Sequence, residues 1–180
     1  GSEMEYQLAQ QGANVVLWDV KHGEEVFGKI ARIEELGVRV MYQPVDVRDR
    51  RQIDEAVNII MDDFGSIDIA CVNAGIVESS PFLEIDSESW NKHIDINLTG
   101  AFHTAQAVTR KMVESNAQGR IIFTSSWVGS IPWPEITAYT VTKAGINMLV
   151  KQMAKELAEY GIRVNAVAPG IVKAGLAGRQ

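Results

Sequence analysis

Short apolar runs rich in β-branched residues alternate with helical hydrophobic patterns along the whole chain, and this alternation limits the possible folds more than any other feature. The apolar runs predict strands at residues 14–18, 38–43, 67–72, 120–124 and 162–167. Spacings of three and four predict helices at residues 22–36, 49–64, 87–114 and 137–160. Strands that are apolar on both faces and alternate with helices are typical of a parallel sheet covered on both sides. We therefore predict a doubly wound α/β fold, with ligands bound beyond the carboxyl ends of the strands.

The composition indicates a globular protein with one domain, residues 1–180. The chain is 46% hydrophobic and has a net charge of −6, so it offers no basic face for nucleic acid. No apolar run approaches the length that spans a bilayer. Cys71 is the only cysteine, which excludes an intramolecular disulfide, and we expect a cytoplasmic protein.

The three histidines do not predict a metal site. His22, His93 and His103 have no cysteine or carboxylate at the spacing of metal ligands. We expect them to be ordinary surface or partly buried residues, and we expect no metal.

Tyr139, Lys143 and Ser126 are candidates for acid–base chemistry. Tyr139 and Lys143 are four residues apart and share one helix face. An ammonium at about 4 Å, at an effective dielectric near 20, would favour the phenolate by roughly 4 kcal/mol, or about three pKa units. Ser126 follows the predicted strand 120–124, so its hydroxyl can point at the same space and hold a substrate oxygen. Taken singly, the Tyr-x-x-x-Lys spacing can occur on any exposed helix, and a lone serine after a strand is usually a turn residue.

Two other strand ends carry residues suited to a dinucleotide. Asp19 ends the first predicted strand, where an acid can bind the adenosine ribose and repel a 2′-phosphate. The alternative is an aspartate that caps a helix or a turn. Asn73, Ala74 and Gly75 follow the strand 67–72, and such small residues allow a ligand close to the backbone, although the same triplet is also common in plain turns.

The ordered series of motifs resembles the short-chain dehydrogenase/reductase family over essentially the whole chain. Residues 8–16 look like the family's first helix running into its second strand, and Val72-Asn73-Ala74-Gly75 is similar to its NNAG motif. The rest of the series consists of Asp46-Val47, Asn97-Leu98-Thr99-Gly100, Ser125-Ser126, the Tyr139–Lys143 segment and the stretch from Val164 to Gly170. The resemblance implies a Rossmann-type fold and hydride transfer between NAD and an alcohol or ketone carbon.

The resemblance also assigns roles to residues. It implies that Tyr139 is the general acid/base, that Lys143 lowers the pKa of Tyr139 and binds the nicotinamide ribose, that Ser126 orients the substrate oxygen, and that Asn97 supports a proton relay. The cofactor-binding residues that it implies, besides Tyr139 and Lys143, are Asp19, Asp46, Val47, Asn73, Ala74, Gly75, Pro169, Gly170 and Val172. No metal is implied.

Two parts of the family pattern are not in this sequence. The usual first strand and its TGxxxGxG loop are missing, and Gly1 is in register with the last glycine of that loop, unless Gly1 and Ser2 are a cloning remnant. The family continues beyond Gln180 through a substrate loop and a final strand. Because the first strand is central in the family's sheet, we expect the sheet to separate without it, and we expect the biological protein to have residues outside this range.

The substrate and the assembly are less well defined by the sequence. We expect Trp127, Trp133 and Glu78 near the mouth of the pocket, where indole faces and a carboxylate would suit a sugar or polyol. The Ser-Trp-Val segment also resembles sugar-dehydrogenase members of the family. The equal alternative is that both tryptophans pack against neighbouring residues or a partner subunit. The alternative functions are an NADPH-dependent 3-oxoacyl-type carbonyl reductase and a non-catalytic dinucleotide-binding protein. The helix 137–160 is apolar on more than one face, and by resemblance we expect a homodimer or homotetramer.

Overall fold

A computed structural model describes residues 2–20 and 24–171. The first half of these residues contains α1 (Ser2–Gln10), β1 (Val15–Asp19), α2 (Glu24–Glu34), β2 (Val40–Pro44), α3 (Arg50–Phe64), β3 (Ile69–Val72) and α4 (Ser87–His93). The second half contains the π-helix η2 (Ile94–Thr99), α5 (Gly100–Glu114), β4 (Arg120–Thr124), α6 (Thr137–Glu156) and β5 (Arg163–Val167). Short 3-10 turns lie at η1 (Phe82–Glu84), η3 (Trp127–Gly129) and η4 (Ala158–Tyr160). The predicted strands and helices are thus confirmed, with shifts of a few residues at their ends.

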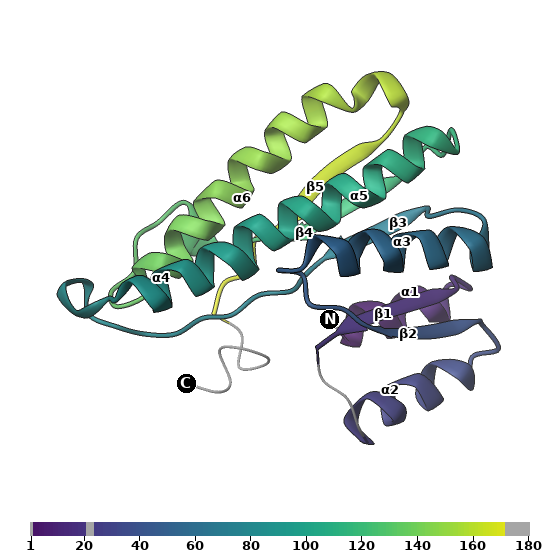
Figure 1. The fold of residues 1–180 in the computed structure, drawn as a ribbon, viewed down its shortest axis with the longest axis horizontal. Helices are drawn as coiled ribbons and strands as arrows, with labels where there is room; N and C mark the ends of the chain where they lie inside the picture. Colours follow the sequence, from purple (N-terminus) through teal and green to yellow (C-terminus); the bar gives the residue numbers. More distant parts are fainter. Residues whose placement is uncertain (1, 21–23, 172–180) are drawn as a thin grey trace.

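The described strands form two parallel sheets (Figure 1), which confirms the predicted separation. One sheet pairs β1 with β2, and the other has the order β3-β4-β5. In the larger sheet, Ile121 of β4 is in register with Ala70 of β3 and with Val164 of β5. Parallel strands place their carboxyl ends at one edge, so the residues that follow β3, β4 and β5 meet there.

Alternate side chains of β1 enter two different hydrophobic clusters. Val15 and Leu17 are buried against α1 and α2, in a small cluster with Ala9 and Ile33. Val16 and Trp18 face the opposite way, toward the main core. Because side chains alternate along a strand, one five-residue strand joins both layers.

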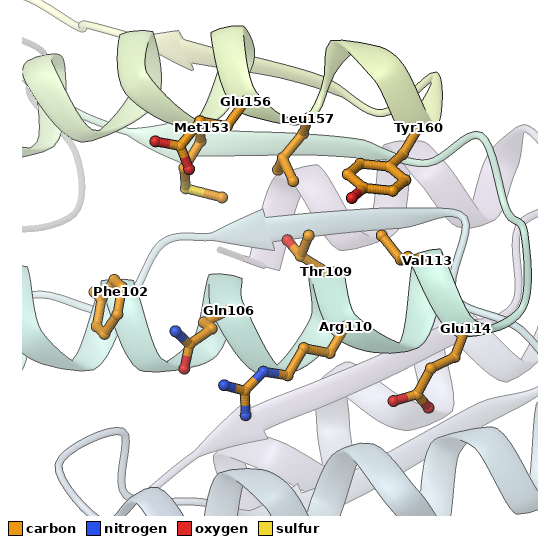
Figure 2. A pocket seen from close by; sticks show the side chains of 10 residues that line it. All are labelled: Phe102, Gln106, Thr109, Arg110, Val113, Glu114, Met153, Glu156, Leu157 and Tyr160. Carbon is orange, nitrogen blue, oxygen red and sulfur yellow. The ribbon is translucent and has the colours of Figure 1, made fainter.

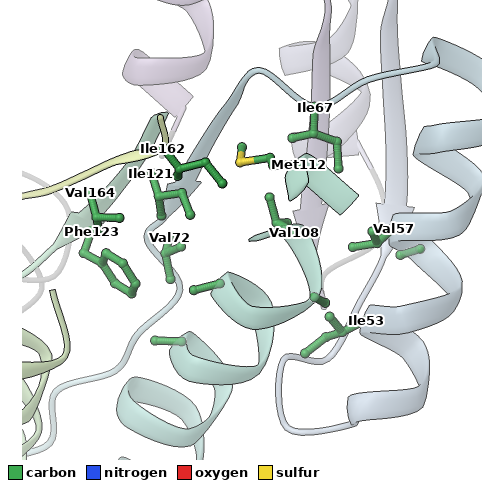
Figure 3. Packing of buried hydrophobic residues seen from close by; sticks show 14 of the residues in the cluster. Ile53, Val57, Ile67, Val72, Val108, Met112, Ile121, Phe123, Ile162 and Val164 are labelled. Atoms are coloured by element: carbon green, nitrogen blue, oxygen red, sulfur yellow. The ribbon is translucent and has the colours of Figure 1, made fainter. Parts of the chain in front are cut away.

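The main core lies between the larger sheet and α3, α5 and α6 (Figure 3). Met112 of α5 and Ile121 of β4 are fully buried, and Phe123 is 1% exposed. The expectation of strands covered on both faces is wrong for β3 and β5, where Ile69, Cys71 and Val167 are exposed. In the described residues, the helix side chains that pack with this sheet in the main core come from α3, α5 and α6.

The helix predicted at residues 87–114 is divided into three parts. Asp86 caps α4 by accepting a hydrogen bond of 2.7 Å from the backbone N–H of Ser89. The wide π turn of η2 then separates α4 from α5. Such single π turns are often found at functional sites, and this one carries Asn97. Hydrophobic spacing could not predict it, because the apolar face continues through the turn.

Candidate active site

The carboxyl ends of β3, β4 and β5 are held together by hydrogen bonds. The Thr124 hydroxyl donates to the Asn73 side-chain oxygen at 2.8 Å, which joins the ends of β4 and β3. Beyond β4, the backbone N–H of Trp127 donates to the Pro169 carbonyl at 3.1 Å. The segments that carry Asn73, Ser126 and Pro169 therefore share one edge of the sheet, where α/β folds bind their ligands.

Lys143 reaches this edge from α6 and is 4% exposed. Its ammonium donates to the Thr124 carbonyl at 2.7 Å. Burial lowers the pKa of Lys143 to about 8, because desolvation disfavours the charged form. An ammonium has three donors, and a ligand hydroxyl is a suitable partner for one that the Thr124 carbonyl does not use.

Tyr139 is half-buried one helical turn before Lys143. Burial raises the pKa of Tyr139 above its ordinary value, and a hydrogen bond with the Ser126 hydroxyl opposes that rise. Lys143 is not among the causes of this shift, and the lowering of the pKa of Tyr139 by Lys143 that the resemblance implies stays a prediction. The Lys143 nitrogen lies 5.4 Å from the centre of the Tyr139 ring and is directed at the Thr124 carbonyl, so desolvation dominates.

Asn97 connects the π-helix to both neighbouring segments and is 1% exposed. Its side-chain oxygen accepts from the Ile76 N–H at 2.8 Å, and its amide donates to the Ile76 carbonyl at 2.9 Å. The same amide donates to the Thr142 hydroxyl at 3.3 Å, and that hydroxyl donates to the Tyr139 carbonyl at 2.7 Å. Asn97 is thus linked through Thr142 to the helical turn that carries Tyr139 and Lys143.

The predicted triplet Asn73, Ala74 and Gly75 lies directly beside these groups. A Cβ atom on Gly75 would come within 3.2 Å of the Asn97 oxygen and 3.8 Å of the Lys143 nitrogen. Glycine therefore allows the backbone to approach the buried pair closely. The structure brings Asn97, Ser126, Tyr139 and Lys143 together around this point.

Ser126 is positioned by a tight contact between η3 and α6. The Ser125 hydroxyl donates to the Asn147 side-chain oxygen at 2.6 Å, which anchors the end of β4 to α6. A Cβ atom on Gly129 would lie 2.7 Å from the Asn147 nitrogen and 2.8 Å from the Lys143 carbonyl. Only a residue without a side chain fits there, so Gly129 allows the turn after Ser126 to sit on α6.

The predicted adenosine-binding residues lie at the ends of β1 and β2. Asp19 ends β1, and its carbonyl accepts from the Tyr42 hydroxyl at 3.0 Å. Asp46 follows β2, and its carboxylate binds the Arg48 guanidinium at 2.6 Å, which holds the pKa of Asp46 below its ordinary value. Val47 is partly buried against the main core. The Asp46 carboxylate is thus already engaged by Arg48, and the Asp46 N–H donates to the Gln52 side-chain oxygen at 2.9 Å.

The remaining predicted residues surround the same edge. Pro169 and Gly170 are exposed beyond β5, and Val172 lies outside the described residues. The rings of Trp127 and Trp133 pack edge to face at 5.3 Å, and Trp133 is half exposed. The Glu78 carboxylate forms an ion pair with Lys92.

Sequence reasoning missed three residues that support the site. The Thr124 carbonyl accepts from Lys143, and the Thr142 hydroxyl links Asn97 to the Tyr139 carbonyl. The sequence signal for these two threonines was only that they lie close to Ser126 and Lys143 in the chain. The expectation for His93 is wrong, because it is fully buried and not an ordinary partly exposed residue. Its position one helical turn before Asn97 was the available signal.

Two other properties follow from the part of the chain that the structure describes. Within it, no three His, Cys, Asp or Glu side chains gather closely enough to hold a metal ion. None of the described helices combines the length and the apolar character that crossing a membrane requires.

Comparison with known proteins identifies relatives along the whole chain. The chain is 36% identical over 166 residues to 5-keto-D-gluconate 5-reductase of Escherichia coli, covering 92% of this chain and 65% of the reductase. It is 34% identical over 172 residues to 3-oxoacyl-(acyl-carrier-protein) reductase FabG of Staphylococcus aureus, covering 96% of this chain and 70% of FabG. This chain therefore spans about two thirds of the length of these relatives.

Solved structures agree with the sequence relatives. The structure of NAD+-bound xylitol dehydrogenase superposes with a TM-score of 0.93 at 34% identity, covering 97% of this chain and 67% of that chain. The family model for short chain dehydrogenases matches residues 1–180. The chain, with its α/β Rossmann fold, belongs to the short-chain dehydrogenase family.

Proposed function

We propose that the protein is an oxidoreductase that transfers a hydride between NAD and an alcohol or ketone carbon. The convergence of Asn97, Ser126, Tyr139 and Lys143 at one sheet edge carries this proposal. Three further features support NAD binding there: the close approach at Gly75, the Lys143 donors and the acid at the end of β1. A non-catalytic dinucleotide-binding protein would not need a buried lysine with a lowered pKa next to a tyrosine.

Tyr139 is the acid/base of the proposed reaction. Because its pKa is raised by burial, its hydroxyl holds its proton at neutral pH and can donate it to the oxygen of a ketone being reduced. In the oxidation direction, the phenolate takes the proton of the substrate hydroxyl. The bound nicotinamide supplies or accepts the hydride. Ser126, hydrogen-bonded to Tyr139, holds the substrate oxygen in line with the phenol.

Lys143 and Asn97 have supporting roles. Lys143 binds the nicotinamide ribose through N–H donors that the Thr124 carbonyl does not use. With a pKa of about 8, it also exchanges protons near neutral pH. Asn97 holds the Ile76 peptide and the Thr142 hydroxyl, and it supports the passage of protons between this buried cluster and water.

We propose NAD over NADP because of Asp19. A carboxylate at the end of β1 suits the two ribose hydroxyls and repels a 2′-phosphate. The similar xylitol dehydrogenase was solved with NAD+ bound. The alternative is an NADPH-dependent 3-oxoacyl-type reductase, and the similarity to FabG is the observation that favours it.

The proposed substrates are sugars or polyols. Both 5-keto-D-gluconate 5-reductase and xylitol dehydrogenase are named for polyhydroxylated substrates. The exposed indole of Trp133, packed against Trp127, offers an apolar face of the kind on which sugar rings stack. A panel of polyols, keto sugars, steroids and 3-oxoacyl thioesters, assayed on the full-length protein with NAD and NADP in parallel, tests this proposal. Turnover of 3-oxoacyl thioesters with NADPH alone would contradict it.

We also propose a homodimer or homotetramer in the cytoplasm. A groove between α5 and α6 is lined by apolar and charged side chains of both helices (Figure 2). Phe102 and Tyr160, at opposite ends of this groove, are 41% and 47% exposed. A second copy of the same surface would cover these rings in a symmetric contact.

A further inference from the structure

The segment Ile76–Glu78 leaves the active site directly after Gly75 and passes along the helix that carries Asn97. Both peptide groups of Ile76 are held by Asn97, at 2.8 and 2.9 Å. Two residues further on, the backbone N–H of Glu78 donates to the Nε2 atom of His93 at 3.1 Å. The segment is therefore attached at two points to one helical face, since His93 and Asn97 are four residues apart.

The partners of His93 define its protonation state. Its Nδ1 atom lies 2.8 Å from the Ser89 carbonyl, which can only accept a hydrogen bond. The Nδ1 atom therefore carries the proton, and the Nε2 atom is the acceptor that the Glu78 N–H needs. A buried histidine with one donor and one acceptor bond is fully satisfied as a neutral imidazole, which explains how it is buried without a charged partner.

Two more contacts complete the boundaries of this segment. The Glu78 carboxylate pairs with Lys92, which lies next to His93 on α4. Two residues after the segment, the backbone N–H of Ser80 donates to the Glu135 carbonyl at 2.7 Å, which links the following chain to the loop before α6. The segment is thus fixed at Ile76 by Asn97 and at Glu78 by His93 and Lys92, and the chain just beyond it is linked to the loop before α6.

We propose that His93 is a positioning residue that holds the Ile76–Glu78 wall of the substrate site. The proposal rests on the proposed function in one respect, namely that the wall faces the substrate. His93 acts through the Glu78 peptide and contacts neither cofactor nor substrate. Its loss should weaken substrate binding more than the chemical step, because Asn97 still holds Ile76 beside Lys143.

Two conservative substitutions separate the two hydrogen bonds of His93. In His93→Gln, the side-chain oxygen takes the place of Nε2 and can still accept from the Glu78 N–H. In His93→Asn, the amide nitrogen takes the place of Nδ1 and can still donate to the Ser89 carbonyl, but nothing reaches Glu78. His103→Asn in α5 is the matched control, because the Nδ1 atom of His103 is buried without a hydrogen-bond partner among the described residues.

The test combines amide hydrogen exchange with steady-state kinetics on the full-length protein. A net hydrogen bond is worth about 1 kcal/mol, so His93→Asn should speed exchange of the Glu78 amide by roughly fivefold to tenfold. It should raise KM for the substrate several-fold, while kcat and the Kd of NAD stay within about twofold. His93→Gln should restore both values, and His103→Asn should change neither.

Two results would overturn the proposal. One is unchanged exchange at Glu78 in His93→Asn, and the other is faster exchange with an unchanged KM, which would leave His93 a purely structural residue. Absence of turnover in the wild-type protein with every substrate would instead refute the proposed function. The exchange measurement would still decide, in that case, whether His93 holds the segment.

Discussion

The Lys143 ammonium donates to the Thr124 carbonyl at 2.7 Å and lies 5.4 Å from the centre of the Tyr139 ring. The bond ties α6 to the carboxyl end of β4. It also buries a lysine whose pKa falls to about 8. In this arrangement the ammonium points at the Thr124 carbonyl and not at the Tyr139 hydroxyl. Burial raises the pKa of Tyr139, and the hydrogen bond with Ser126 opposes that rise.

Replacing Tyr139 with Phe should abolish most activity and preserve the fold. The ring and its packing remain, but the phenol hydroxyl is lost. A positioned acid/base contributes roughly 10²–10⁴-fold, so kcat should fall by at least that factor. Stopped-flow or steady-state assays measure kcat, and fluorescence titration should give an unchanged Kd for NAD. Near wild-type turnover in a folded variant would place the acid/base elsewhere.

Replacing Lys143 with Met should reduce activity and raise stability at neutral pH. The folded pKa of about 8, against 10.5 for a free lysine, opposes folding by roughly 3 kcal/mol at pH 7. Loss of the bond to Thr124 offsets about 1 kcal/mol of this, so the free energy of unfolding should rise by about 2 kcal/mol.

The pH dependence of that gain has a definite sign. Between pH 8 and 10.5 the unfolded chain holds the Lys143 proton and the folded chain has lost it, so wild-type stability rises with pH across this window. The advantage of Lys143→Met should therefore be full below pH 8. It should reverse by pH 10.5, where the desolvation cost is gone and the bond to Thr124 still favours the wild type. Urea unfolding at pH 7, 9 and 10.5 measures it. A constant difference at the three pH values would contradict the assigned pKa.

Replacing Asp19 with Ala should narrow the preference for NAD over NADP. The wild-type carboxylate would face a 2′-phosphate at the end of β1, and its removal takes away that repulsion. The ratio of kcat/KM for the two cofactors measures the preference. Asp46→Ala is a suitable comparison, because the Asp46 carboxylate is engaged by Arg48 and should affect both cofactors alike. Higher wild-type efficiency with NADP would refute the NAD assignment.

Replacing Gly129 with Ala should destabilise the fold near Ser126. The added Cβ atom would lie 2.7 Å from the Asn147 nitrogen and 2.8 Å from the Lys143 carbonyl, so η3 must move away from α6. Overpacking of this kind costs about 1–3 kcal/mol. Chemical unfolding measures the loss, and Gly28→Ala, in an open helical position, is the control. Equal effects of the two substitutions would show that the contact at Gly129 is unimportant.

A charge in the groove between α5 and α6 should disrupt the proposed assembly. Phe102→Glu places a carboxylate where a second copy would cover the ring, and burying an unpaired charge is unfavourable. Light scattering at micromolar concentration should show a dimer or tetramer for the wild type and a smaller species for the variant. A monomeric wild type would contradict the assembly.

The sequence by itself determined the order and type of the elements. Apolar runs such as Arg120–Thr124 and the helical pattern from Thr137 onward are local signals, and Asp49 and Gly65 at the ends of α3 are local caps. The motif series also indicated Asn97, Ser126, Tyr139 and Lys143. The elements and caps could be predicted because each depends on residues close together in the chain, whereas the four site residues were implied by the resemblance to the family.

The tertiary structure decided which groups touch. Three contacts of the site join residues 15 to 21 positions apart in the chain. They are the bonds from Asn97 to Ile76, from Lys143 to Thr124 and from the Glu78 N–H to His93. The pKa of Tyr139 likewise depends on desolvation, which only the packed structure defines. Helix spacing placed Lys143 beside Tyr139, but the carbonyl at the end of β4 determined where its ammonium points.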